Sequence, residues 1–193
     1  MARRDYLMIV SGLPRSGTSM MMRMLDAGGI PALTDQVRAA DESNPRGYYE
    51  YEPAKETKKD PSWIAASLGR AVKMVHLLLL DLPLTYAYRV VFMQRDIEEI
   101  IQSQNKMLDR LGKNSNDLPA GRLAAVYQMQ IENVMRHIRR HDEQFRLLEV
   151  DYNALIREPG PPVEKVSRFL DGLDVTQMAA IIDQDLYRTR IAR

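Results

Sequence analysis

The sequence contains no cysteine. This absence excludes disulfide bonds, zinc sites built on thiolates and a cysteine nucleophile, and it fits a reducing compartment. Hydrophobic runs are also short, since none approaches the roughly 20 apolar residues that a membrane-spanning helix needs. The first apolar stretch begins at Tyr6, which predicts that no signal peptide precedes it. We therefore expect a cytoplasmic protein that does not enter a membrane.

An excess of charge of either sign is absent as well. The chain has 27 Lys and Arg residues against 26 Asp and Glu residues, and its formal net charge is +1. Such a balance does not attract nucleic acid or an anionic membrane as a whole, so any anion site must be local. We expect neither nucleic acid nor a membrane as a partner. The length of 193 residues allows a substantial core, and we predict a single domain over residues 1–193.

The most informative segment is a glycine loop near the N-terminus. Gly12 and Gly17 have the GxxxxG spacing of a Walker A phosphate-binding loop. The lysine that follows the second glycine in that motif is missing, because Thr18 stands in its place. The nearest cation is Arg15, two positions before the second glycine. The pattern predicts a phosphate-binding loop whose positive charge lies upstream of its usual place.

The loop leads from an apolar strand into a helical pattern at residues 18–27. A helix N-terminus offers unpaired amides and a partial positive charge, so the backbone here can bind a phosphate without any side chain. The arginine of the loop adds a cation, and two hydroxyl groups follow the second glycine. The predicted phosphate-binding residues are Pro14, Arg15, Ser16, Gly17, Thr18 and Ser19.

Strand and helix patterns alternate along the rest of the chain. Four nearly continuous apolar runs predict buried parallel strands, at residues 6–10, 72–80, 89–93 and 145–150. Between and after them, the periodicity predicts helices, at residues 18–27, 34–42, 54–59, 96–111, 120–142 and 162–170. Turn-rich residues predict a surface loop at 112–119, and the aromatic and acidic segment 41–52 is typical of loops that contact substrates. The alternation indicates an α/β fold.

Two motifs resemble those of PAPS-dependent sulfotransferases. The sequence PRSGTS followed by a methionine-rich helix is similar to the loop that binds the 5'-phosphosulfate in this family, and VVFMQRDIEEIIQSQ is similar to its 3'-phosphate motif. Arg95 and Ser103 have the eight-residue spacing of that second motif. The late segment FRLLEVDYNALIREPGPPVEKVSRFLDGL also resembles the family. The likeness covers most of the chain and is nearest to small bacterial members and, at the glycine loop, to the tyrosylprotein branch.

The resemblance implies a P-loop-type three-layer sandwich with a central, mostly parallel sheet. It also implies PAPS (3'-phosphoadenosine 5'-phosphosulfate) as the donor, with no metal. Arg15 would stabilise the charge that builds on the leaving phosphate oxygen, and Arg95 and Ser103 would bind the 3'-phosphate. The late basic residues Arg188 and Arg190 would cover the donor. The acceptor would be a hydroxyl or amine of an unidentified small molecule or peptide.

The general base for such an acceptor stays open among three residues. Asp35 stands at nearly the distance from the loop that the carboxylate-using branch of the family implies, and it is slightly favoured. Glu50 lies in the aromatic loop, and His76 falls inside a predicted apolar strand. Each of these side chains also has an ordinary structural interpretation, as a helix cap, a solvated loop charge or a packed core histidine.

Two other functions compete with sulfuryl transfer. Leu77–Asp81 is similar to a Walker B strand that ends in a magnesium-binding aspartate, which would indicate an ATP-dependent small-molecule kinase or NTPase. The missing Walker lysine argues against that hypothesis. The third alternative is a non-catalytic module that binds PAP, the desulfated donor, or another nucleotide without turnover.

Overall fold

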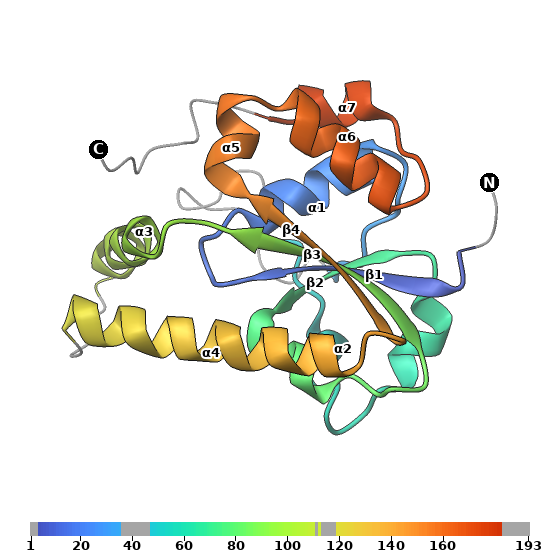
Figure 1. Cartoon of the computed structure of the whole chain (residues 1–193), viewed down its shortest axis with the longest axis horizontal. Coiled ribbons are helices and arrows are strands. Elements are labelled where there is room, and N and C mark those ends of the chain that lie inside the picture. Colours follow the sequence, from blue (N-terminus) through green and yellow to red (C-terminus); the bar gives the residue numbers. More distant parts are fainter. Residues whose placement is uncertain (1–3, 36–46, 111, 113–118, 183–193) are drawn as a thin grey trace.

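A computed structural model describes residues 4–35, 47–110, 112 and 119–182. Its centre is a sheet of four parallel strands in the order β2-β1-β3-β4 (Figure 1). The strands are β1 (Tyr6–Gly12), β2 (Ala71–Val75), β3 (Ala87–Gln94) and β4 (Phe145–Asp151). The predicted α/β class is confirmed, and every strand pairing within the described residues is parallel.

Helices cover both faces of this sheet and make three layers (Figure 1). One face carries α1 (Thr18–Ala27), α5 (Tyr152–Arg157), α6 (Gly160–Phe169) and α7 (Val175–Ala180). The other carries α2 (Glu52–Lys55), α4 (Ala120–Arg140) and the 3-10 helices η1 (Ser62–Ser67) and η2 (His76–Asp81). Helix α3 (Ile97–Arg110) follows β3 and packs beside α4.

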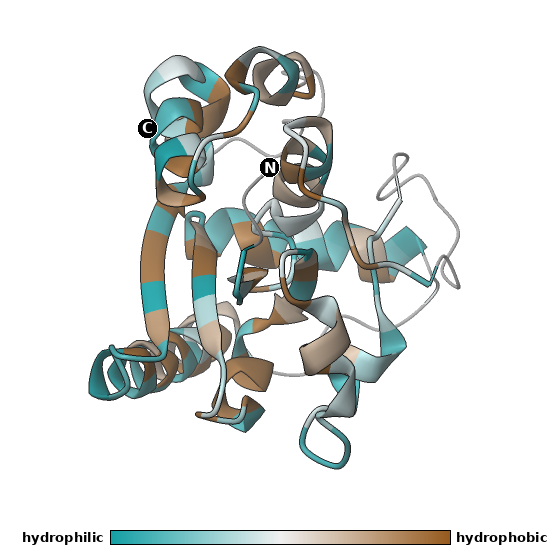
Figure 2. Ribbon diagram, turned by 90° about the vertical axis from the view of Figure 1, so that its right-hand side faces the viewer, coloured by the Kyte–Doolittle hydropathy of each residue, from teal (hydrophilic) through white to brown (hydrophobic). Residues whose placement is uncertain are grey.

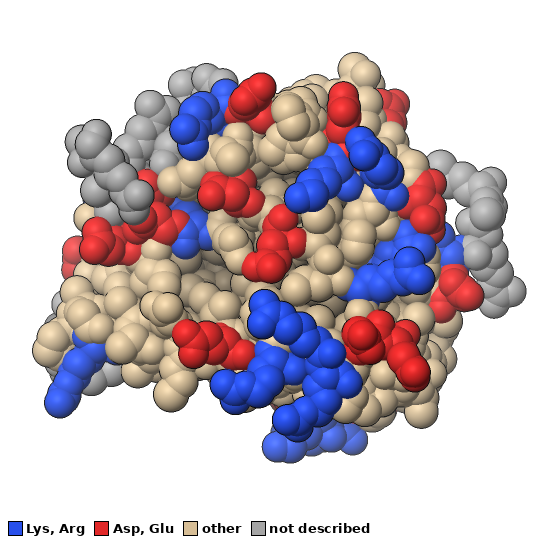
Figure 3. Space-filling model, in the orientation of Figure 1, with Lys and Arg blue, Asp and Glu red and all other residues tan. Residues whose placement is uncertain are grey.

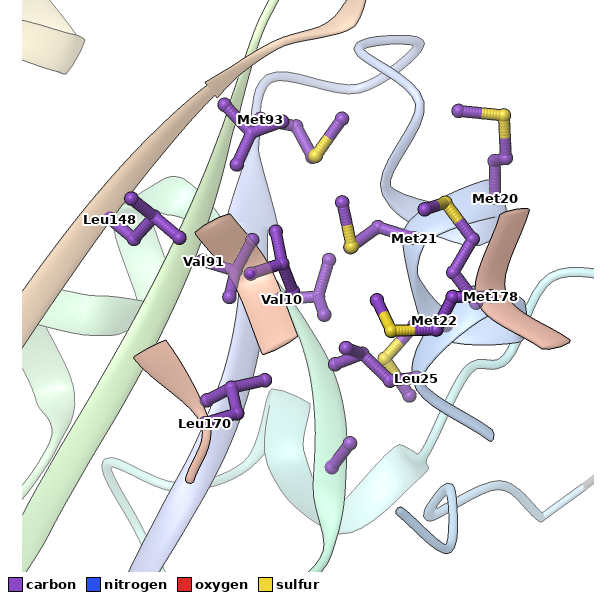
Figure 4. Packing of buried hydrophobic residues seen from close by; sticks show 14 of the residues in the cluster. Val10, Met20, Met21, Met22, Leu25, Val91, Met93, Leu148, Leu170 and Met178 are labelled. Carbon is purple, nitrogen blue, oxygen red and sulfur yellow. The ribbon is translucent and has the colours of Figure 1, made fainter. Parts of the chain in front are cut away.

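Each face of the sheet has its own hydrophobic core, which explains why the central strands are apolar throughout. On the first face, Met21 and Met22 of α1 pack near Val10 of β1 and Val91 of β3 (Figure 4). Methionine fills irregular space well because its side chain is unbranched and flexible. Strand β4 lies at an edge of the sheet, and its residues alternate largely between buried and exposed. Hydrophobic and hydrophilic residues correspondingly alternate along the ribbon (Figure 2).

Because all four strands are parallel, their carboxyl ends lie at the same end of the sheet, and the predicted site residues follow these strand ends. Gly12, at the end of β1, pairs with Val75 of β2 and with Met93 of β3. The glycine loop, His76 and Arg95 therefore start from neighbouring strand ends, and Tyr152 follows the end of β4.

Several predicted elements differ from the structure. The strand predicted at 72–80 ends at Val75, and residues 76–81 form η2 instead. An apolar run alone does not distinguish a buried strand from a short helix. Helix α2 covers only part of the range predicted at 54–59 and begins earlier. Thr34 and Asp35 are not helical, and the rest of the helix predicted at 34–42 lies outside the described residues.

Two short helices, α5 and α7, were not predicted. Each begins after an aspartate whose side chain accepts a hydrogen bond from a backbone N–H three residues later, Asp151 in one case and Asp174 in the other. Such N-caps are the sequence signal for these helices. Within the described part of the chain, no helix is both long enough and apolar enough to cross a membrane.

Candidate active site

The two glycines of the loop are required by close packing. Gly12 has a φ of 149°, and a Cβ at this position would lie 2.5 Å from Ser16 Oγ and 2.6 Å from the Met93 carbonyl oxygen. Gly17 has a φ of 96°, and a Cβ there would lie 2.4 Å from a ring carbon of Tyr152. The loop is thus closely packed against the end of β3 on one side and the start of α5 on the other.

The loop ends at the N-terminus of α1. Gly17 is the N-cap residue, and as a glycine it offers no side chain to cap the first turn. Among the predicted phosphate-binding residues, Ser16 donates a hydrogen bond from its amide to the Leu13 carbonyl (3.2 Å). The Ser16 hydroxyl is buried and has no hydrogen-bond partner among the described residues. Pro14 is exposed, whereas Thr18 and Ser19 are half-buried.

The two predicted phosphate motifs meet at Arg15. Its Nε donates a hydrogen bond to Ser103 Oγ on α3 (3.1 Å), and its carbonyl accepts one from Nη1 of Arg95 (3.1 Å), 80 residues further along the chain. Arg15 has a φ of 71°, in the left-handed region that non-glycine residues rarely occupy. Residues predicted separately for the 5' and 3' groups of a nucleotide therefore form one cluster.

Arg95 is held by residues that sequence reasoning missed. Its Nε donates to Glu99 Oε2 (2.9 Å), and both side chains are nearly buried, with exposures of 7% and 4%. The Arg95 guanidinium also lies 4.8 Å from the centre of the Tyr152 ring. The only signal for the ion pair in the sequence is the spacing of four residues, which brings Arg95, just before α3, close to Glu99 in the first turn of that helix.

His76 lies beside the glycine loop rather than inside a strand, which corrects the expectation for this residue. It is the first residue of η2 and follows Val75, the partner of Gly12 in the sheet. The side chain is 2% exposed, and its Nε2 lies 3.0 Å from Oε1 of Gln130 on α4. Its Nδ1 is buried and makes no hydrogen bond of normal geometry within the described residues.

The surroundings of His76 keep its imidazole neutral. Burial lowers its pKa below the usual value, and the neighbouring Gln130 side chain and Gly12 backbone offset only part of this effect. A neutral imidazole at neutral pH is the form that a general base needs.

The two carboxylate candidates for the general base, Asp35 and Glu50, bind groups of α2. The Asp35 side chain accepts a hydrogen bond from the Glu52 amide in the first turn of this helix (2.6 Å). Glu50 pairs with Lys55 (2.7 Å), and its carbonyl accepts from the Asp35 amide (3.2 Å). The segments containing Asp35 and Glu50 are therefore tied together. The remaining candidates, Arg188 and Arg190, lie outside the described residues.

A second cation near the loop, Lys73, was not predicted. It lies on β2, and its Nζ contacts the Tyr48 carbonyl and lies 3.5 Å from Ser19 Oγ in the first turn of α1. A lysine within an apolar strand is the sequence signal that was available, because a buried ammonium group needs polar partners. The segment around Tyr48 is thereby joined to the start of α1.

The similarity of Leu77–Asp81 to a Walker B strand does not hold in the structure. Asp81 ends the 3-10 helix η2 and does not follow a strand. Among the residues that the structure describes, no group of three or more His, Cys, Asp and Glu side chains could hold a metal ion. Acidic and basic side chains are interspersed over the face shown in Figure 3, so an anionic ligand would depend on the local groups of the loop.

Comparison with known proteins identifies the family of this chain. Residues 5–184 match the family model described as the sulfotransferase domain. The chain belongs to the sulfotransferase family. A comparison with curated protein sequences found no match.

Solved sulfotransferases share the fold. The sulfotransferase domain from the curacin biosynthetic pathway is 13% identical, with a TM-score of 0.55 over 96% of this chain and 80% of that one. The corresponding domain of the Synechococcus PCC 7002 olefin synthase is 14% identical, with a TM-score of 0.57 over 97% and 81%. Sulfotransferase STF1 from Mycobacterium tuberculosis H37Rv is 18% identical, with a TM-score of 0.58 over 93% and 71%.

The sulfotransferase family and fold make this chain a transferase that moves a sulfuryl group. Its predicted relationship, its α/β architecture and its class of reaction are confirmed.

Proposed function

We propose that this sulfotransferase transfers the sulfuryl group of PAPS to a hydroxyl or amine of a small molecule or peptide. The observation that carries the proposal is the hydrogen bond between Arg15 and Ser103. It joins the loop suited to a 5'-phosphosulfate to the helix suited to a 3'-phosphate. A donor with phosphate groups at both positions matches such a pair of adjacent anion sites.

In the proposed reaction, the acceptor oxygen or nitrogen attacks the sulfur of the bound donor. The bond between sulfur and the bridging oxygen breaks, the electron pair stays on the phosphate, and PAP leaves. Arg15 would neutralise this charge, helped by the N-terminus of α1. Lys73 supplies a second cation next to Ser19. Arg95 and Ser103 would contact the 3'-phosphate.

For the general base, we favour His76 over the two carboxylates. It follows the strand residue that pairs with Gly12, so it lies at the start of the glycine loop. Asp35 and Glu50 are instead engaged with the Glu52 amide and Lys55 at α2. Burial also lowers the pKa of His76, which favours the neutral form that a general base needs.

Thermal unfolding with and without nucleotides tests the donor. At a PAP concentration of a hundred times Kd, binding to the folded state adds about 2.7 kcal/mol, which raises Tm by about 5–11 °C for a chain of this size. We expect PAP and PAPS to stabilise the protein without magnesium. Stabilisation by ATP and magnesium, but not by PAP, would refute PAPS as the donor.

Turnover is measured with PAPS and a set of acceptors that includes a phenol, a sugar, an amine and a tyrosine peptide. Transfer to at least one of them is expected. Stabilisation by PAP together with no transfer to any of these acceptors would favour the non-catalytic binding module.

A further inference from the structure

The carboxylate of Glu99 lies in an unusual place for a glutamate. It belongs to the first turn of α3, where acidic residues are common because the helix N-terminus attracts negative charge. Its neighbour Glu98 is exposed, as such residues normally are. The Glu99 side chain is only 4% exposed, and it points toward Arg95 and toward Asn153, whose Nδ2 lies 3.3 Å from Oε1.

Glu99 fixes the direction of the Arg95 guanidinium. A buried carboxylate needs charged or hydrogen-bonding partners to offset the loss of water, and Nε of Arg95 provides one at 2.9 Å. The ring of Tyr152 flanks the same guanidinium. Held from these sides, Arg95 directs Nη1 to the carbonyl oxygen of Arg15 (3.1 Å).

That carbonyl belongs to a residue in a strained backbone conformation. Arg15 has a φ of 71°, and a non-glycine residue keeps such a conformation only where its surroundings hold it. The backbone conformation sets the direction in which the side chain leaves the loop, toward Ser103. A line of contacts thus runs from Glu99 through Arg95 to the backbone of Arg15.

We propose that Glu99 is a positioning residue that acts through Arg95 to hold the Arg15 guanidinium in its catalytic orientation. The inference rests on the proposed function, in which Arg15 stabilises the leaving group. It assigns Glu99 no contact with the donor or the acceptor. Apart from the contact of Arg95 with the 3'-phosphate, its effect on the reaction must therefore depend on the Arg15 side chain.

A double-mutant cycle of Glu99→Gln and Arg15→Ala tests this dependence. Two quantities are measured, kcat at saturating PAPS and the Kd of adenosine 5'-phosphosulfate, which lacks the 3'-phosphate and so reports on binding without that group. In the wild-type background, Glu99→Gln is expected to lower kcat by about tenfold to a hundredfold, as misplacement of a catalytic group does, and to weaken binding. In the Arg15→Ala background, neither quantity should change further.

Glu98→Gln is the matched control, because it makes the same chemical change one residue away on an exposed side chain, and it should behave as wild type. If Glu99→Gln does not fold, Glu99→Asp replaces it in the cycle, since it keeps the charge and shortens the reach. A smaller loss is then expected, which again disappears without Arg15.

An equal loss of kcat and affinity in both backgrounds would overturn the inference about Glu99 but leave the proposed function intact. Wild-type kcat and Kd in the Glu99 variants would have the same meaning. A wild-type protein that binds neither PAP nor adenosine 5'-phosphosulfate would instead refute the proposed function.

Discussion

Replacement of Gly17 by alanine should impair both stability and donor binding. The backbone at Gly17 has a φ of 96°, and a left-handed conformation costs an L-residue roughly 1–2 kcal/mol. The new methyl group would also lie 2.4 Å from the ring of Tyr152, and relief of such overpacking costs typically about 1–3 kcal/mol. The sum of about 2–5 kcal/mol lowers Tm by about 4–20 °C for a chain of this size.

Two other glycines separate these contributions in the same thermal unfolding assay. Gly172 has a φ of 90° but open space around its missing Cβ, so Gly172→Ala should show only the backbone cost of roughly 1–2 kcal/mol. Gly121 lies in α4 with neither constraint, and Gly121→Ala should stabilise by up to about 1 kcal/mol. A Gly17→Ala protein no less stable than Gly172→Ala would refute the contact with Tyr152.

Three further predictions concern the proposed chemistry. Arg15→Ala should lower kcat about a hundredfold to a thousandfold, the usual loss for one transition-state donor, with an unchanged circular dichroism spectrum; unchanged turnover would remove Arg15 from the reaction. Arg95→Ala should weaken PAP far more than adenosine 5'-phosphosulfate in calorimetry, because only PAP carries the 3'-phosphate, and equal weakening would refute a contact of Arg95 with the 3'-phosphate. Burial lowers the pKa of His76, so below about pH 6.5 the unfolded chain binds a proton that the folded chain does not, and stability falls as pH falls. His76→Gln should flatten this loss in urea titrations between about pH 7 and pH 5, and an unaltered pH dependence would contradict the burial argument.

The sequence predicts the strands β1 and β3 well because their apolar residues form nearly continuous runs that a sheet covered on both faces accommodates, and it predicts the edge strand β4 from an apolar stretch broken by Arg146 and Glu149. It fails at residues 76–81, where leucines continue the run but the chain turns into a 3-10 helix and leaves Leu77 39% exposed. Composition alone cannot reveal that change, because burial of these residues depends on α4 packing from a distant part of the chain.

The candidate site also has parts that the sequence predicts and parts that it does not. That Arg15, Arg95 and Ser103 would gather was predictable, since they follow the carboxyl ends of parallel strands or lie on the next helix. The role of Glu99 was not predictable in full, because the four-residue spacing indicates its pair with Arg95, whereas Asn153 becomes its neighbour only when α3 and α5 meet. The engagement of Asp35 with the start of α2 likewise depends on the tertiary fold.

The contact between Gly17 and Tyr152 has a consequence for how the protein matures during synthesis. A chain emerging from the ribosome exposes the glycine loop early, but the residue that packs against it is translated only after most of the sequence. Because domains generally fold as units, the nascent chain is expected to bind no nucleotide until β4 and α5 have emerged. Stalled chains of increasing length would acquire affinity for PAP in a single step after Tyr152 leaves the exit tunnel.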